Sequence, residues 1–178
     1  VMTASERGEL QLTGYGISGI PVFQVSRYAV RALEEGSYVE AELDFFPDME
    51  EEELAVLLNQ RMMHCTYKTQ EELLIGLIPD KLIPVALRDG KDLDRIAHAV
   101  KCVRVTVRDS AGFARAQVCS GGVDLAEVTD TLESRRYPGL YFAGEVLDVD
   151  GACGGYNLQW AWSSGAVAGF SAAKEEKE

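Results

Sequence analysis

The residue types best suited to chemistry lie in one stretch, residues 144–162, which reads GEVLDVDGACGGYNLQWAW. A short apolar segment, residues 138–145, leads into it and predicts a buried parallel strand whose carboxyl end meets a ligand. Gly154 and Gly155 then open a long apolar segment rich in Ala, Ser and Gly, which predicts a helix buried around its whole circumference. The first N–H groups of a helix carry the positive end of its dipole, and glycine leaves room for a ligand oxygen. The stretch therefore predicts a site for an electron-rich group.

Two other patterns imitate ligand sites but have the wrong context. GYGISG, residues 14–19, has the spacing of a dinucleotide-binding turn. The preceding GELQLT alternates polar and apolar residues, whereas the first strand of such a fold is apolar on both faces. We expect a tight turn whose glycines let another chain segment or a ligand approach the helix start. DVDG, residues 148–151, resembles the opening of a calcium loop, but Cys153 and Gln159 replace the glycine and glutamate that such a loop requires.

The histidines and cysteines form no recognisable catalytic or metal-binding pattern. His64 and Cys65 are adjacent, and neighbours on a helix point about 100° apart. His98 is expected to be packed or solvated rather than catalytic. The four widely spaced cysteines predict reduced thiols and no metal site; they are Cys65, Cys102, Cys119 and Cys153. No side chain stands out as a catalytic acid or base, so the catalytic residues are unknown at this level.

Composition narrows the class of protein and of partner. The chain has 178 residues and a formal net charge of −12, with no basic stripe, so we expect no nucleic-acid partner. No apolar run reaches the about 18 residues that a membrane helix needs, and no targeting segment is seen. We expect a cytoplasmic protein with a small-molecule substrate and no membrane partner. The terminal KEEKE is interpreted as a solvated charge run.

Hydrophobic periodicity predicts the elements that must position these residues. Residues 9–13 indicate a strand, glycines a turn, and residues 18–36 a helix that Gly36 ends. A half-buried strand follows at 38–46, with Val39, Ala41, Leu43 and Phe45 on one face.

Four short helices are expected in residues 48–101. Their start signals are Asp48 with Glu51 in a capping box, Thr69 with Glu72, Asp80 after Pro79, and Asp92. Residues 103–107 then alternate as a strand, and residues 116–119 are expected to pair back as a hairpin. The fold class is therefore mixed α+β: strands of a sheet or barrel with a four-helix cluster, then a short strand and a buried helix.

Residues 120–169, SGGVDLAEVTDTLESRRYPGLYFAGEVLDVDGACGGYNLQWAWSSGAVAG, strongly resemble the C-terminal part of a family of bacterial flavoproteins. These are NAD(P)/FAD-dependent oxidoreductases that include aminoacetone-oxidase-type and BaiN-like proteins. LTGYGISGIPVFQVSR and FFPDMEEEEL, nearer the N-terminus, look like the domain inserted into that family's FAD-binding fold. The resemblance therefore covers nearly the whole chain.

The resemblance implies a domain organisation and a cofactor. Residues 1–113 match part of the inserted domain, with a helical subdomain at 48–101, and residues 114–178 match the last segment of the Rossmann-like FAD domain. The family's adenine-side glycine fingerprint is not found in this sequence, so the chain looks like a fragment whose partner is a missing N-terminal FAD-binding half. The implied activity of the full-length protein is hydride transfer between a small substrate and FAD, with NAD(P)H a candidate donor. The fragment alone is expected to be inactive.

The resemblance also implies cofactor-binding residues. Gly144 and Glu145 match the segment beside the ribityl and pyrophosphate groups. Residues 154–158 match the helix start that faces the pyrimidine edge of the flavin, and residues 121–123 match a flanking turn. The implied set is Gly121, Gly122, Val123, Gly144, Glu145, Gly154, Gly155, Tyr156, Asn157 and Leu158. The alternative hypothesis is a non-catalytic α/β binding or interaction module whose helices 48–101 cover a partner.

Overall fold

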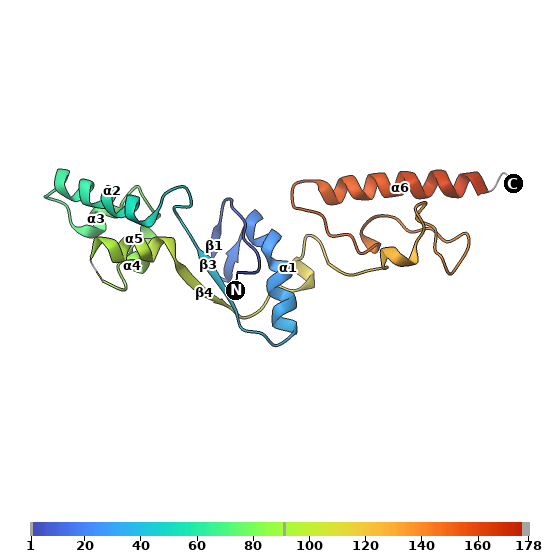
Figure 1. The fold of residues 1–178 in the computed structure, drawn as a ribbon, viewed down its shortest axis with the longest axis horizontal. Coiled ribbons are helices and arrows are strands. Elements are labelled where there is room, and N and C mark those ends of the chain that lie inside the picture. Colours follow the sequence, from blue (N-terminus) through green and yellow to red (C-terminus); the bar gives the residue numbers. More distant parts are fainter. Residues whose placement is uncertain (1, 91, 176–178) are drawn as a thin grey trace. The chain divides into compact units, whose positions relative to one another are not determined.

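The computed structural model describes residues 2–90 and 92–175, and its contacts divide the chain into two compact units (Figure 1). The first unit combines the residues before 38 with those after 108, and the second comprises residues 38–108. The predicted boundary at residue 113 concerns the domains of the full-length protein and stays a prediction. The last three residues of KEEKE, 176–178, lie outside the described residues.

The first unit begins with the predicted strand, turn and helix. Strands β1 (Gln11–Thr13) and β2 (Gly16–Ser18) pair as an antiparallel hairpin, and helix α1 (Ile20–Glu34) follows. Gly19 caps α1 with a φ of 106°, and a Cβ added there would collide with the carbonyl oxygen of Glu9. This confirms the expected close approach of another chain segment to the helix start.

The C-terminal part of this unit has fewer strands than expected. Within the described residues, 116–119 form no strand, because β4 pairs with β3 instead, so the predicted hairpin is wrong. The predicted parallel strand at 138–145 is also wrong. Its residues make an isolated antiparallel bridge, Glu133 with Tyr141, and then enter a single 3-10 turn, η4 (Gly144–Val146). A parallel strand needs a parallel neighbour, and residues 132–134 run antiparallel to this segment.

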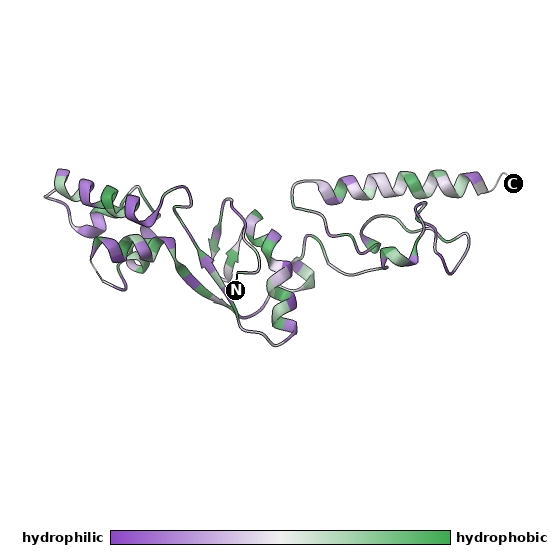
Figure 2. Cartoon of the chain, viewed as in Figure 1, coloured by the Kyte–Doolittle hydropathy of each residue, from purple (hydrophilic) through white to green (hydrophobic). Residues whose placement is uncertain are grey.

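Helix α6 (Tyr156–Glu175) forms as predicted, but it is not buried around its circumference. Ser164 and Ala168 are buried, whereas Trp162 and Phe170 are 77% and 73% exposed. Figure 2 shows apolar residues distributed along this helix, among polar ones. The difference arises because the packing on α6 comes from one side. The small core there consists of Val128, Leu132, Leu147 and Ala168, bordered by Val123, Tyr141, Phe142, Val149 and Trp160.

The second unit, residues 38–108, which we call the helical unit, is a two-stranded ribbon that carries a cluster of helices. Strand β3 (Val39–Leu43) pairs antiparallel with β4 (Val103–Val107), in register from Val39↔Val107 to Leu43↔Val103. The four predicted helices are present as α2 (Glu51–His64), α3 (Gln70–Leu74), α4 (Ile83–Ala86), which follows the 3-10 turn η1 (Asp80–Leu82), and α5 (Leu93–Lys101). Their core consists of Leu54, Leu58, Leu74, Ile78, Ile83, Ala86, Ile96, Ala97 and Val100.

The helix starts agree with the capping signals at some positions and differ at others. The capping box of Thr69 and Glu72 is confirmed, and Asp92 is the N-cap of α5. The box predicted for Asp48 and Glu51 is wrong, since Glu50 is the N-cap and pairs with Glu53. A turn closed by the Met49 amide on the Phe46 carbonyl holds Asp48 outside the helix. Asp80 opens the 3-10 turn rather than capping it.

No helix within the described ranges has the length and apolar character needed to cross a membrane.

Candidate functional site

Two of the predicted site segments lie side by side. Val123 donates its amide to the Val146 carbonyl at 2.8 Å, and the Asp148 amide donates to the Val123 carbonyl at 3.0 Å, which makes a parallel bridge. Gly122 lies so close to this partner that an added Cβ would sit 2.5 Å from the Val146 oxygen. The structure thus brings residues 121–123 together with residues 144–148.

Two carboxylates tighten the same contact through backbone amides. Glu145 Oε1 accepts from the Cys119 amide at 2.9 Å, and Asp148 Oδ1 accepts from the Gly121 amide at 2.9 Å. Charge-assisted bonds of this kind are stronger than neutral ones. Glu145 and Asp148 therefore hold the neighbouring loop, a role that sequence reasoning predicted for neither of them.

Gly144 is anchored on α6 by two side chains that sequence reasoning also missed. The Gly144 amide donates to Ser164 Oγ at 2.9 Å, and Trp160 Nε1 donates to the Gly144 carbonyl at 3.1 Å. The Ser164 hydroxyl itself donates to the Trp160 carbonyl at 2.6 Å, and Ser164 is 1% exposed. The available signal was their spacing: polar atoms four residues apart lie on one face of a helix.

The residues before and at the start of α6 face open space. Asn157 bonds both backbone groups of Gly151, at 2.9 and 3.1 Å, and so closes the loop. Gly154 and Gly155 adopt φ angles of 123° and 99°, and a Cβ added at either would meet no atom within 4 Å. Tyr156 and Leu158 have two thirds of their side chains exposed. A left-handed backbone without side chains leaves this helix end accessible to a ligand.

Helix α6 connects the two parts of the predicted set. Its first turn follows Gly155, and its second and third turns supply Trp160 and Ser164 to Gly144. All ten predicted residues thus lie either in the paired segments or at the start of the helix that holds them.

The aspartates that imitate a calcium loop have other partners. Asp148 is bonded to Gly121, and Asp150 forms an ion pair with Arg27 at 3.1 Å. Across residues 2–90 and 92–175, no group of three or more His, Cys, Asp and Glu side chains is arranged to hold a metal ion.

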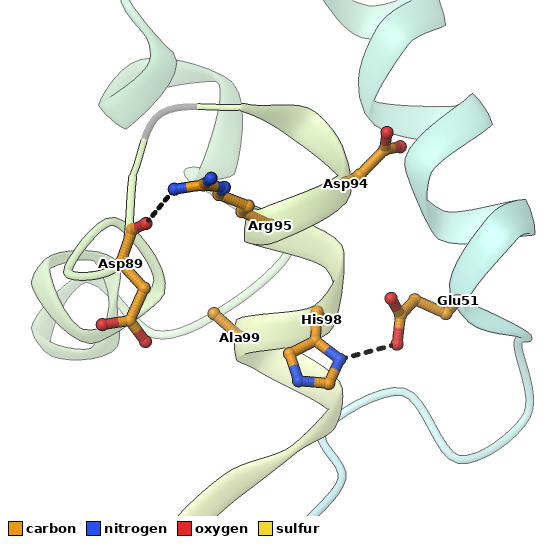
Figure 3. Close-up of a pocket in the computed structure, with 6 residues that line it drawn as sticks. All are labelled: Glu51, Asp89, Asp94, Arg95, His98 and Ala99. Atoms are coloured by element: carbon orange, nitrogen blue, oxygen red, sulfur yellow. Dashed lines mark hydrogen bonds and ion pairs between the residues drawn. The ribbon is translucent and has the colours of Figure 1, made fainter.

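Both histidines, His64 and His98, lie in the helical unit, residues 38–108. His98 Nδ1 is 2.9 Å from Glu51 Oε2 beside an open hollow of about 420 Å³, and the imidazole is 62% exposed (Figure 3). Figure 3 also shows Arg95 turned toward the Asp89 carbonyl, which it contacts at 3.2 Å. His64 is bonded to the Gln60 carbonyl at 2.7 Å, within its own helix. Of the two alternatives expected for His98, packed or solvated, its exposure agrees with the solvated one.

Comparison with known proteins places this arrangement in a family. Residues 14–171 match the HI0933-like protein Rossmann domain. The chain is 45% identical over 185 residues to a 3-dehydro-bile acid delta(4,6)-reductase of Clostridium scindens, covering 96% of this chain and 45% of the relative. It is 33% identical to a ribosomal RNA dihydrouridine synthase of Haemophilus influenzae (94% of this chain, 43% of the relative). It is 35% identical to one of Escherichia coli (89% and 40%).

The chain spans less than half the length of each of these relatives. The matched region nevertheless includes both paired segments and the start of α6. The resemblance to FAD-dependent oxidoreductases is therefore confirmed, and the chain belongs to the HI0933-like Rossmann-domain family of flavoproteins.

Proposed function

We propose that this chain is the C-terminal part of an FAD-dependent oxidoreductase that reduces a carbon–carbon double bond conjugated to a carbonyl group. The observation that carries the proposal is the open start of α6 at Gly154 and Gly155, on the same helix that anchors the paired segment 144–148 through Trp160 and Ser164. The residues fit a flavin because a helix start without side chains offers N–H donors and a positive dipole end to an electron-rich edge.

The names of the relatives support the choice of reaction. The 4,6-diene that delta(4,6) denotes, beside a 3-oxo group, and the 5,6 double bond of uridine are both conjugated to a carbonyl. Reduction of either adds a hydride to the carbon distant from the carbonyl and a proton to the nearer one. Bound FAD, in its reduced form, supplies the hydride, and NAD(P)H is the proposed donor that regenerates it.

The residues of this chain act by binding and by electrostatics. The backbone at 154–158 is proposed to face the flavin edge that gains negative charge on reduction, where the helix dipole would stabilise that charge. Residues 121–123 and 144–145 are proposed to flank the ribityl and pyrophosphate groups. Asn157 keeps the loop closed through Gly151, so its role is to position backbone rather than to transfer a proton.

The charge of the chain favours a small substrate over RNA. Two relatives act on ribosomal RNA by name, but this chain has 29 acidic and 17 basic residues. RNA binding relies on Lys and Arg at phosphates, and repulsion from an acidic surface opposes it. We therefore propose a neutral or weakly charged unsaturated carbonyl compound as the substrate.

The test uses the purified full-length protein. We expect a yellow protein whose NAD(P)H-reduced flavin is reoxidised anaerobically by a 3-oxo-4,6-diene steroid and not by ribosomal RNA that lacks dihydrouridine. Reoxidation by the RNA alone would replace the small substrate with a nucleic acid. A colourless protein would contradict the flavin proposal and favour a binding module.

Replacing Gly155 with Phe tests the position of the cofactor. The side chain would enter the space that the flavin edge needs, so we expect the yellow colour to be lost. Gly76 is the matched control, since it also has a left-handed φ of 82° and open space around its Cβ, but it lies in the helical unit. A Gly155→Phe protein as yellow as Gly76→Phe would overturn the placement.

The chain alone is expected not to retain FAD. Helix-dipole interactions contribute about 0.3 to 2 kcal/mol each. Immobilising a cofactor costs at least about 4 kcal/mol, so a few of these interactions do not suffice without the adenine-side contacts. A purified 178-residue chain that stays yellow after gel filtration would refute this.

A further inference from the structure

Helix α1 holds the loop that leads into α6 at two points. Arg27 Nη1 lies 3.1 Å from Asp150 Oδ2 and also donates to the Asp150 carbonyl at 3.1 Å. Gln24 Oε1 accepts a hydrogen bond from the Cys153 amide at 2.8 Å. These contacts join residues more than 120 positions apart in the sequence.

The two side chains act from one face of the helix. Gln24 and Arg27 are three residues apart, a spacing that places side chains next to each other. The side chains of Arg27 and Asp150 are 25% and 21% exposed, so water and salt screen this pair less than an exposed one. A hollow of about 380 Å³ lies beside these two α1 residues, and its lining includes Gln24, Arg27, Tyr28 and Ala152.

The loop needs such anchors because its last two residues, Gly154 and Gly155, are not held in place by side-chain packing. Gly154 and Gly155 have no side chains and open surroundings. Asn157 from α6, and Gln24 and Arg27 from α1, form hydrogen bonds with the backbone of residues 150–153. The position of this loop is therefore determined partly by a helix far away in sequence.

We propose that Gln24 and Arg27 are positioning residues that hold residues 150–155 in the conformation that receives the flavin. The proposal rests on the function proposed above and adds to it a coupling between α1 and the cofactor. Loss of either contact frees the loop, so the bound conformation must be selected from a larger ensemble. Apparent affinity falls in proportion to the fraction that is competent to bind.

The experiment measures the loop and the cofactor separately in the full-length protein. Gln24→Met and Arg27→Met remove the contacts at similar side-chain size. Gln24→Glu keeps an acceptor oxygen for the Cys153 amide and should restore the wild-type behaviour. Arg31→Met is the matched control, because Arg31 is exposed one turn further along the same helix. The two readouts are hydrogen exchange of the amides at 150–155 and the dissociation constant for FAD.

We expect amide exchange at 150–155 and the dissociation constant for FAD to rise about tenfold in Gln24→Met and Arg27→Met, the effect of losing one charge-assisted or partly buried hydrogen bond. Arg31→Met and Gln24→Glu should match the wild type. Unchanged exchange in both methionine variants would overturn the inference even in a yellow protein. A colourless wild type would contradict the function instead, while the exchange rates still decide whether α1 holds the loop. If Arg27→Met fails to fold, Asp150→Asn weakens the same pair and gives the same readout.

Discussion

The Ser164 hydroxyl is a small group whose removal should be measurable, because it satisfies a buried amide. Ser164 is 1% exposed, and its Oγ accepts from the Gly144 amide at 2.9 Å while it donates to the Trp160 carbonyl at 2.6 Å. Alanine at this position leaves the Gly144 N–H buried without its acceptor. The cost of such an unsatisfied group is about 1 to 3 kcal/mol.

A second effect works in the opposite direction and must be subtracted. Alanine has a higher helix propensity than serine, by up to about 0.7 kcal/mol in a helix interior. Ser163→Ala makes the same change in the same turn of α6, where the side chain is exposed and accepts from Gln159 Nε2 at 2.9 Å. The difference between the two variants therefore isolates the buried bond to Gly144.

The assay is equilibrium urea unfolding of the full-length protein, together with its FAD content after purification. We expect Ser164→Ala to be about 1 to 3 kcal/mol less stable than Ser163→Ala and to lose flavin more readily, because Gly144 belongs to the proposed site. Equal stabilities within about 0.5 kcal/mol, the usual range of a neutral surface change, would refute the reasoning.

Three further outcomes follow from the helical unit. The Leu58 side chain is 2% exposed, so Leu58→Ala should lower the free energy of unfolding by about 2 to 5 kcal/mol in urea titrations. A smaller loss would mean that the core collapses around the cavity. The hydrogen bond from the Thr69 amide holds the pKa of Glu72 below its ordinary value of 4.5. The ionised carboxylate therefore stabilises α3 at pH values above the unfolded-state pKa, and this contribution is lost as pH falls through the folded-state pKa. Acid titration followed by circular dichroism should show a shallower loss of helix in Glu72→Gln than in the wild type. Burial, together with the neighbouring Glu42, raises the pKa of the Cys102 thiol above its ordinary value of 9.0. Iodoacetamide at pH 8 should therefore alkylate Cys102 more slowly in the folded protein than in the urea-unfolded chain, and equal rates would contradict this.

Local patterns predicted the elements that depend on local interactions. The alternation of Val39, Ala41 and Leu43 corresponds to the half-buried face of β3, and the switch to helical periodicity marks the cluster at 48–101. Local patterns did not identify the N-cap of α2, because several acidic residues follow one another there. Glu50 rather than Asp48 begins α2, since the turn before it decides which residue enters the helix.

Strand pairing and the packing on α6 depend on residues far away in the sequence, so local patterns did not predict them. The predicted strand at 138–145 and the hairpin at 116–119 required neighbours that the chain supplies elsewhere or in another direction. The composition of α6 indicates a surface suited to burial, but not what packs on it. Shared motifs with the family indicated the glycines of the candidate site. The spacing of Trp160 and Ser164 places both on one face of α6, but it does not identify Gly144, 20 residues before Ser164, as their partner.

The contact between Gly19 and Glu9 has a consequence for how mutations in this family are interpreted. The backbone oxygen of Glu9 already lies against the capping glycine of α1, where it would collide with any added Cβ. The space beside Gly19 is thus occupied by the chain's own backbone, which a side chain at this position would displace. Substitution of Gly19 should disable the protein by misfolding alone. Loss of activity there is no sign of a nucleotide, despite a spacing that pattern searches associate with one.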